Sequence, residues 1–564
     1  MAYDVAPKVN ALRKYAGWLL GVHNASAYAP AVAFDRDTAV GGSLAPNPLP
    51  FITLPLPLKG ILLCLLVTLI VSYTRSSWRR LPPQPRRFPI IGNLLQLTDK
   101  RWLFSRECKE RFSEVMYLDV LGKPTIIFNS LKSASEVLEH RASNSIGRPR
   151  LIMIGILSAG LGLPAMNHGE QWRRMRRAAH EALTKVAVQR YHPIETKEAT
   201  ILVSALLTNP ENREQHIQRT AASAILSITY DYPTLTSGLE KVVQDMDRRV
   251  HQGARAATGT SLVEFFPWMI HVPQRFAKWK REVFKQASER SETFLRLFNR
   301  VKIDLESVGV RPSFSASLIE HQDRYRLSER EMAYLGGTMF GAGFETTSTT
   351  LMWWTLAMVA FPEVQRRAQA ELDAVVGRER LPTYADAPRL PYMRAIIKEV
   401  IRWRPAVRLG LPHVAAEDDW YDGMFIPKGA TCVANIWQCN HDRRVFGDDA
   451  DEFKPERHLG ENGELLPGPK ETNREGHVSF GFGRRVCVGR HLVNDSLFIH
   501  TARMLWAANL KCGRDENGKE LPPDINTFVD LGIVSRPPPH DCIITPRFPQ
   551  AQSILAEERE KFED

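Results

Sequence analysis

A single cysteine stands in the glycine-rich and basic segment FGFGRRVCVG, residues 480–489. Its nearest cysteine neighbours along the chain are Cys439 and Cys512, and the seven cysteines include no C-x-x-C pair. A disulfide framework or a zinc site built from cysteine pairs is therefore not indicated. The adjacent arginines favour the thiolate form of Cys487, and the glycines let the backbone approach a flat, bulky group. Three interpretations stay open: a nucleophile with His491 as its base, the sole protein ligand of a metal, or an inert cysteine in a turn.

An acid and two hydroxyls interrupt a long apolar stretch at residues 327–362. Its capping box, Ser328 with Glu331, predicts the start of a helix, which a proline ends after about 50 Å. The stretch contains four glycines, each less favourable than alanine in a helix by about 1 kcal/mol, so something must pack closely against it. A buried acid, Glu345, beside the hydroxyl of Thr346 can form a proton path with water. The alternative is that this hydroxyl bonds only its own backbone.

An E-x-x-R pattern, Glu399 and Arg402, places a carboxylate and a guanidinium on one helix face. Arg457 follows in a loop before the cysteine segment. A carboxylate between two guanidinium groups can form a buried network that fixes this loop. A solvated surface pair is the alternative.

A basic helix is predicted from the segment HGEQWRRMRRAAH, in which Trp172 and Arg176 share one face. One face can hold a buried anion such as a carboxylate, while the other face meets an acidic partner. The other face carries Arg173, Arg174 and Arg177. A nucleic-acid-binding or merely solvated helix is the alternative, and no nucleic-acid fold signature supports the former.

The elements that must position these side chains are mostly helical. From about residue 102 the chain shows long amphipathic stretches, with short strand-like pieces at 113–128 and 408–435. We therefore expect a mainly α fold with small β-sheets, of the α+β class, in residues 94–548. The net charge of +11 indicates acidic partners or an anionic membrane surface.

A transmembrane anchor is predicted at residues 58–78. Residues 60–74 carry no charge, and with Trp78 and the snorkelling Arg75 the stretch reaches a bilayer thickness of about 30 Å. Arginines cluster after the stretch, which places the C-terminal bulk in the cytosol by the positive-inside rule.

The flanking regions complete the expected organisation. We expect the extension 1–57 to be luminal, with Asn24 as a candidate glycosylation acceptor and 15–34 as a candidate additional span. Residues 79–93 are rich in proline and arginine and are interpreted as a stiff linker. Residues 549–564 are interpreted as a C-terminal tail.

The four patterns, in this order, resemble the cytochrome P450 family of heme-thiolate monooxygenases. The family motif F-x-x-G-x-R-x-C-x-G is matched by Phe480, Gly483, Arg485, Cys487 and Gly489. The helix motif A/G-G-x-D/E-T-T, the E-x-x-R, the P-E-R and the W-x-x-x-R are also present. The resemblance spans about residues 81–548 and includes a hinge typical of membrane-anchored fungal microsomal members. His458 departs from the pattern, because an aromatic residue is usual after P-E-R.

The resemblance implies the P450 fold, heme b as cofactor, and Cys487 as the axial thiolate ligand of its iron. The partners of the heme propionates would be Trp172, Arg176, His413 and Arg485. Further cofactor contacts would come from Ala342, Phe480 and Gly489. Glu345 and Thr346 would deliver protons to bound oxygen, and Glu399, Arg402 and Arg457 would form a structural triad.

The function implied is oxygen insertion into a lipophilic small molecule, in fungal secondary metabolism, at the endoplasmic reticulum membrane with a cytosolic catalytic domain. Electrons would come from NADPH–cytochrome P450 reductase, with cytochrome b5 as a further candidate donor, at the basic helix. The substrate would contact residues 151–166, Phe340, Ala342, Val407, Leu411 and 526–534. A heme-thiolate isomerase or dehydratase, a xenobiotic-detoxifying monooxygenase and a non-catalytic heme-binding protein are the alternatives. The intact Glu345–Thr346 pair argues against the first and the last.

Overall fold

The computed structural model describes residues 56–97, 113–235, 241–307 and 312–562. Contacts divide the chain into two units, Met1–Tyr73 and Thr74–Asp564. Helix α2 (Leu56–Arg75) contains most of the stretch predicted to be an anchor. Among the described residues, no helix combines the length and the apolarity needed to cross a bilayer. The anchor stays a prediction, while Asn24 and the candidate span 15–34 lie outside the described residues.

The described part of the second unit is mainly helical, with four small sheets. Its longer helices are α6 (Glu170–Ala182), α7 (His192–Thr208), α8 (Arg213–Tyr230), α9 (Lys241–Ala257), α11 (Lys278–Ser307), α14 (Glu329–Ala360), α15 (Pro362–Val375), α16 (Pro391–Trp403), α19 (Arg490–Ala507) and α20 (Ala551–Glu560). Shorter helices are α4 (Leu131–Ser135), α5 (Ile152–Leu157), α10 (Leu262–Phe265), α12 (Phe314–Glu320), α13 (Gln322–Tyr325), α17 (Ile436–Asn440) and α18 (Arg443–Phe446). The expectation of a mainly α fold with small sheets is confirmed.

The largest sheet has the order β1-β2-β6-β3. Its strands are β1 (Val115–Val120), β2 (Lys123–Phe128), β6 (Thr431–Ala434) and β3 (His413–Val414). The remaining sheets contain β11 (Cys542–Pro546), β7 (Ala508–Arg514) and β8 (Glu520–Leu521); β4 (Asp419–Tyr421) and β5 (Met424–Ile426); and β10 (Ser535–Arg536) and β9 (Val529–Asp530). Both stretches predicted to be strand-like therefore contain strands.

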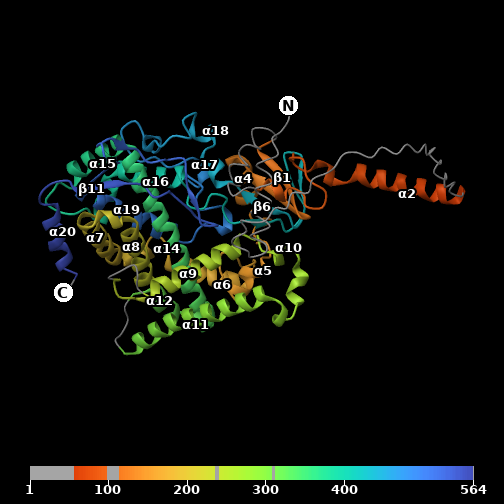
Figure 1. Ribbon diagram of the computed structural model, residues 1–564, viewed down its shortest axis with the longest axis horizontal. Helices are drawn as coiled ribbons and strands as arrows, with labels where there is room; N and C mark the ends of the chain where they lie inside the picture. Colours follow the sequence, from red (N-terminus) through yellow and green to blue (C-terminus); the bar gives the residue numbers. More distant parts are fainter. Residues whose placement is uncertain (1–55, 98–112, 236–240, 308–311, 563–564) are drawn as a thin grey trace, which may run out of the picture. The chain divides into compact units, whose positions relative to one another are not determined.

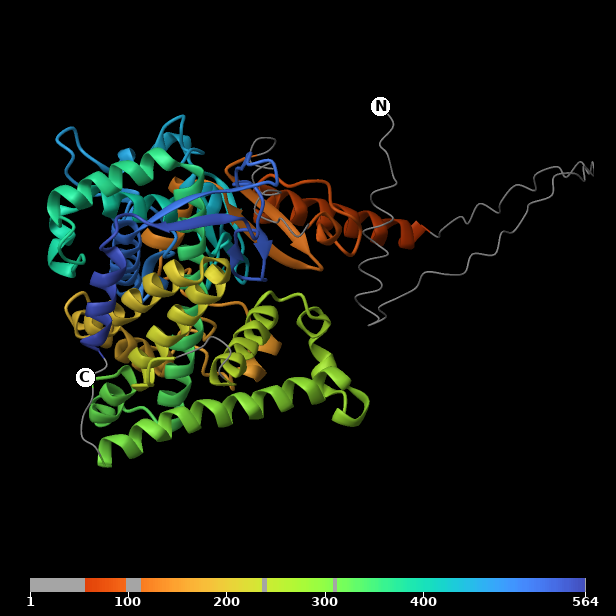
Figure 2. The same ribbon diagram turned by 60° about the vertical axis from the view of Figure 1, so that its left-hand side comes forward.

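Helix α14 runs through the middle of this unit, among α8, α9 and α19, and the long α11 crosses it near one end (Figures 1 and 2). It begins with the predicted capping box, in which Ser328 and Glu331 cap each other's backbone groups. Two of its glycines meet neighbours closely. A Cβ atom at Gly337 would lie 2.4 Å from the Phe294 ring, and one at Gly343 would lie 2.8 Å from Ile225. The predicted close packing is thus made against α11 and α8.

Two apolar cores meet along α14. One core includes its N-terminal half up to Phe344, together with α6, α8 and α11. The other begins at Leu351 and includes α7, α16 and α19. The polar residues of the stretch 345–350 lie between the two cores.

Both ends of this unit differ from expectation. Residues 79–93, expected as a linker, contact the fold, because Tyr117 donates its N–H to Pro83 O at 3.0 Å and Gly92 bridges to Val120. The expected tail, 549–564, contains helix α20, whose Leu555 is only 1% exposed. Described residues of both segments therefore pack against the second unit. The composition of the two segments did not indicate these contacts.

Candidate active site

The cysteine segment forms a tight loop that leads into α19. The backbone N–H of Cys487 donates to Phe480 O at 2.8 Å and closes the loop. Gly483 adopts a φ of +57°, and a Cβ atom there would lie 2.6 Å from Leu138 O. Only glycine combines this backbone conformation with so close an approach. The loop therefore holds Cys487 just before the N-terminus of α19.

The thiol of Cys487 is surrounded by protein and yet keeps an accessible surface. Burial raises its pKa, while the Gly489 amide and the charges of Arg176 and Arg490 oppose that rise. The side chain of Cys487 is nevertheless exposed. Ala342 is also exposed, although it lies in the middle of α14. A thiol so placed is available to a large guest rather than packed as an inert core residue.

Two half-buried arginines lie near this thiol. Arg176 donates to Val486 O at 2.5 Å, and Arg485 donates to Ile146 O at 2.9 Å while its guanidinium lies 4.2 Å from the centre of the Trp172 ring. Burial, followed by the charge of Arg176, lowers the pKa of Arg485 to about 10. Trp172, Arg176 and Arg485 are residues that the resemblance assigned to the heme propionates, which are anionic.

His413 and Arg148 extend the cluster. His413 lies 2.7 Å from Ser145 O through Nδ1, and burial together with the charges of Arg148 and Arg485 lowers its pKa to about 3. Arg148 donates to Leu411 O and Pro412 O, both at 2.7 Å. Burial and the charge of Arg485 lower the pKa of Arg148 to about 9. Sequence reasoning missed Arg148, because no motif contains it.

The cationic cluster fits the carboxylates of a heme. Within the described part of the chain, no ion pair joins Arg148, Arg176 or Arg485 to a carboxylate. Nη1 of Arg485 is buried and has no hydrogen-bond partner. Uncompensated positive charge in an interior is costly, so an anionic guest is required. A planar group with two carboxylates, held through iron by Cys487, satisfies both the thiol and the cations.

Glu345 and Thr346 lie one turn of α14 after the exposed Ala342. Thr346 Oγ1 donates to Ala342 O at 2.7 Å, which is the backbone bond considered as the alternative role, and the helix continues without a break. Glu345 is 9% exposed, and its Oε1 has no partner. Burial raises the pKa of Glu345, and the charge of His251 opposes the rise. The pair thus offers a hydroxyl and a buried acid whose pKa is raised, next to each other on α14.

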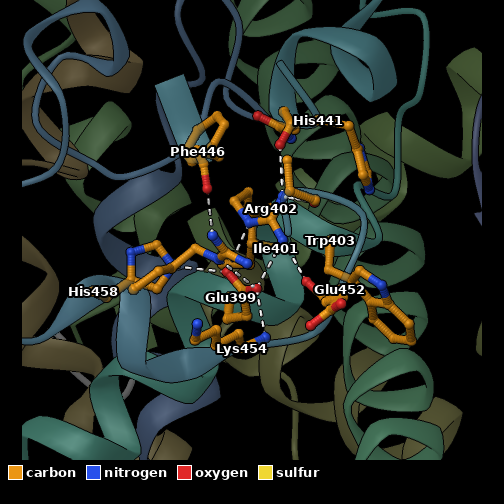
Figure 3. Close-up of polar contacts among 12 residues, drawn as sticks. Glu399, Ile401, Arg402, Trp403, His441, Phe446, Glu452, Lys454 and His458 are labelled. Atoms are coloured by element: carbon orange, nitrogen blue, oxygen red, sulfur yellow. Dashed lines mark hydrogen bonds and ion pairs between the residues drawn. The ribbon is translucent and has the colours of Figure 1, made fainter. Parts of the chain in front are cut away.

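The Glu399 carboxylate joins the predicted triad in a fully buried network. Arg402 Nε donates to Glu399 Oε2 at 2.7 Å, and Arg457 Nε donates to Glu399 Oε1 at 3.0 Å. His458 Nε2 is a further partner, 3.0 Å from Oε2, so that His458 and Arg402 both approach the carboxylate (Figure 3). Burial alone would raise the pKa of Glu399, but the Arg402 charge and these hydrogen bonds hold it well below its usual value.

This network reaches the cysteine loop through Asn440. Arg402 Nη1 donates to Asn440 O at 2.7 Å. The Asn440 side chain accepts from Val478 N at 2.9 Å and donates to Ser479 Oγ at 2.9 Å, immediately before Phe480. The charged network therefore anchors the start of the loop that presents Cys487.

The residues assigned to substrate contact differ in their surroundings. Val407 and Leu411 are half-buried. Phe340 is fully buried and stacks on Phe344 with ring centroids 5.6 Å apart, so its placement does not support a substrate contact. The segments 151–166 and 526–534 contain α5 and β9 and alternate between buried and accessible residues.

The basic helix α6 presents two of its three assigned arginines outward. Arg173 and Arg177 are exposed, and Arg173 pairs with Glu170 at 3.0 Å on the same helix. Arg174 is half-buried and lies 3.7 Å from Glu331 at the start of α14. Arg174 therefore has a packing role that the sequence did not indicate.

The fold and the site define a heme-thiolate protein. A family model described as Cytochrome P450 matches residues 82–543. A cytochrome P450 monooxygenase of Armillaria gallica is 49% identical over 492 residues, covering 87% of this chain and 94% of that protein. Cytochrome P450 monooxygenase 58 of Postia placenta is 40% identical over 503 residues, covering 88% and 95%. A zebra fish cytochrome P450 with progesterone has a TM-score of 0.66 at 25% identity, covering 80% of this chain and 100% of that one.

The chain belongs to the cytochrome P450 family and is a cytochrome P450 monooxygenase. Its cofactor is heme with Cys487 as the thiolate ligand. Heme supplies an iron whose thiolate ligand favours cleavage of the O–O bond of dioxygen. Arg148, Arg176, His413 and Arg485 would hold the cofactor's carboxylates, while the Glu399 network anchors the cysteine loop and α14 supplies an acid and a hydroxyl.

Proposed function

We propose that this enzyme inserts one oxygen atom into a lipophilic small molecule of fungal secondary metabolism. The accessible thiol of Cys487 and the exposed Ala342 in the middle of α14 carry the proposal, because both are available to a bound group. The surrounding segments are mainly apolar, which suits a lipophilic ligand. The assignment to secondary metabolism rests on the segment VRLGLPH, residues 407–413, which resembles fungal microsomal members.

The proposed electron donor is NADPH–cytochrome P450 reductase, with cytochrome b5 as a second donor. Exposed Arg173 and Arg177 on α6 support an acidic partner there. The proposed location is the endoplasmic reticulum membrane, with the catalytic unit in the cytosol. Support comes from exposed apolar side chains of α2 and from the arginines that follow it. These side chains are Ile61, Leu63, Leu65, Val67 and Val71.

The decisive experiment combines spectroscopy with turnover. The reduced carbon-monoxide complex of the wild type should show the red-shifted Soret band of thiolate ligation, and Cys487→Ala should lack it. Cys64→Ala, at an exposed cysteine of α2, should keep the band. With reductase, NADPH and isotopically labelled dioxygen, one labelled oxygen atom should enter the product of an apolar substrate. Turnover without reductase would instead indicate an isomerase or dehydratase.

Topology is tested separately in intact microsomes. Added protease should digest the catalytic unit if it is cytosolic, and its protection would refute the orientation. A mobility shift on removal of N-linked glycans, absent from Asn24→Gln, would support a luminal N-terminus and a single span.

A further inference from the structure

Two cysteines face each other across a pair of antiparallel strands. The register of β7 and β11 sets Cys512 directly opposite Cys542. Both thiols are free and half-buried. Side chains of directly opposite residues project to the same face of a sheet, with Cβ atoms about 4.5–5.5 Å apart. The two sulfur atoms therefore lie on one face, within reach of each other.

The two cysteines occupy a type of strand position in which opposite Cα atoms lie close together. The backbone N–H of Gly513 donates to O of Asp541, the residue opposite it, at 3.3 Å. Hydrogen-bonded and non-hydrogen-bonded pairs alternate, so Cys512 and Cys542 form a non-hydrogen-bonded pair with Cα atoms about 4.5 Å apart. A disulfide requires Cα atoms about 4.4–6.8 Å apart. A Cβ atom at Gly513 would lie 2.3 Å from the Asp541 Cβ, which confirms how closely the strands approach.

The surroundings distinguish the two thiols. Burial raises the pKa of both, but the Arg213 guanidinium opposes this rise at Cys542, whereas Glu520 adds to it at Cys512. Arg213 is held in place by donating to His540 O at 2.8 Å. The Arg213 charge therefore favours the thiolate, which is the reactive form, at Cys542, while the Glu520 charge disfavours it at Cys512.

We propose that Cys512 and Cys542 are an oxidisable dithiol that hydrogen peroxide converts into a disulfide. The Cys542 thiolate attacks one peroxide oxygen, which gives a sulfenic acid on Cys542 and releases hydroxide. The Cys512 sulfur then attacks the Cys542 sulfur, and the sulfenic oxygen leaves as water with the Cys512 proton. In total, two thiols and one peroxide give one disulfide and two waters. The sulfur atoms are oxidised and the peroxide oxygens are reduced.

The crosslink would close a loop that is relevant to the substrate. Residues 513–541 lie between the two cysteines and contain the segment 526–534, which the resemblance assigns to substrate contact. The loop is also connected to α14, because Trp353 Nε1 donates to Ser535 O at 2.9 Å. A disulfide would add a covalent tie at the base of the loop.

The test uses the heme-loaded, full-length protein, in which the cofactor protects Cys487. After treatment with hydrogen peroxide in slight molar excess, free thiols are alkylated and the protein is digested without reductant. Mass spectrometry should find one crosslinked peptide pair that contains Cys512 and Cys542 and has lost two hydrogens, and a reductant should reverse the crosslink. In Cys512→Ser the crosslink should be absent and Cys542 should carry added oxygen. Alkylation of both cysteines after peroxide, or a crosslink from either one to another cysteine, would overturn the proposal.

A second measurement avoids variants altogether. Phenylarsine oxide bridges two neighbouring thiols, so the reduced wild type should bind one equivalent at this pair. Protein first treated with peroxide should bind none there. Equal binding before and after peroxide would contradict the dithiol.

Discussion

The imidazole of His458 lies 3.0 Å from Glu399 Oε2, while Arg457 approaches Oε1, so the carboxylate is held on both oxygens. Burial lowers the pKa of His458, although the Glu399 carboxylate opposes the shift. Because a carboxylate oxygen only accepts, Nε2 of His458 carries the hydrogen and donates it to Oε2. The family usually has an aromatic residue at this position. In this chain His458 stands there and completes the charged network behind the cysteine loop.

His458→Phe should destabilise the protein by about 1–3 kcal/mol, because it removes one donor from a buried carboxylate. Arg457→Ala should cost about 3–5 kcal/mol, because it leaves a buried charge less compensated. Heme content should fall in the same order, since the network anchors the loop of Cys487. Arg367→Ala, in the surface pair with Glu456, is the control and should cost less than about 1 kcal/mol. Thermal unfolding and heme absorbance measure both effects, and an unchanged His458→Phe protein would show that this contact is incidental.

Thr346→Ala should uncouple NADPH oxidation from product formation. A tenfold fall in product per NADPH corresponds to about 1.4 kcal/mol in the barrier, and released hydrogen peroxide should rise. Thr350→Ala is a matched control, because Thr350 Oγ1 makes the same kind of backbone bond, to Thr346 O at 2.8 Å, one turn further along α14. If both variants lose coupling equally, or neither does, the hydroxyl of Thr346 has only a structural role.

The coupling should depend on pH through Glu345. Helix α9 packs on α14 one turn before this residue, where Val250 lies 3.3 Å from a Cβ atom placed on Gly341. Burial raises the pKa of Glu345; His251 and Arg536 oppose the rise, and Asp247 adds to it. His251 forms a pair with Asp247 at 3.2 Å. The charged neighbours of the acid thus come from α9 and from β10.

His251→Gln removes the side chain whose charge opposes the rise, so the pKa of Glu345 should increase further. The pH at which product per NADPH changes should therefore move upward, and Glu345→Gln should abolish that pH dependence. Arg248→Gln, at an exposed arginine of α9 that pairs with Asp245, should leave the profile in place. The measurement is the coupling ratio between pH 6 and pH 8.5. A profile that does not move in His251→Gln would exclude an influence of this histidine.

Glu195→Gln should stabilise the protein at high pH. Burial raises the pKa of Glu195 from 4.5 to about 8, although Ser496 donates to its Oε2 at 2.9 Å. Between these values the folded state binds more protons than the unfolded state, so the wild type loses stability as pH rises. The loss is at most about 1.4 kcal/mol per pH unit, and glutamine does not incur it.

Unfolding midpoints of wild type and Glu195→Gln should therefore diverge from pH 5 to pH 8, with the variant higher. Glu211→Gln, at an exposed position, should follow the wild type throughout. Parallel curves for Glu195→Gln and the wild type would mean that Glu195 is ionised in the folded protein.

Helix boundaries were predicted well where a capping motif or a proline determines them locally. The capping box at Ser328 and the proline at 362 predicted a helix over 327–362, and α14 spans Glu329–Ala360. The sequence could not show that Leu555 of the expected tail would reach the core. A short amphipathic segment reveals its partner only when the rest of the fold is present.

The site was predictable to the extent that motifs define it. Spacing brought Glu399 and Arg402 together, because three residues are nearly one helical turn. Arg148 and His458 were missed as partners, since their contacts join segments distant in sequence and no local pattern encodes them. Phe340 shows what a position on a helix leaves open, because its ring is buried against Phe344 and its contact with a substrate stays a prediction.

The glycines of α14 constrain how this enzyme can diversify. A methyl group at Gly337 or Gly343 would clash with Phe294 or Ile225. This side of the helix therefore accepts no larger side chains unless its neighbours move. The position of this side of α14 is consequently set by its neighbours α8 and α11. New substrate preferences are therefore expected to arise from the segments that the resemblance assigns to substrate contact, such as 151–166 and 526–534. Mutant libraries aimed at altered selectivity should randomise these two segments and leave the glycines untouched.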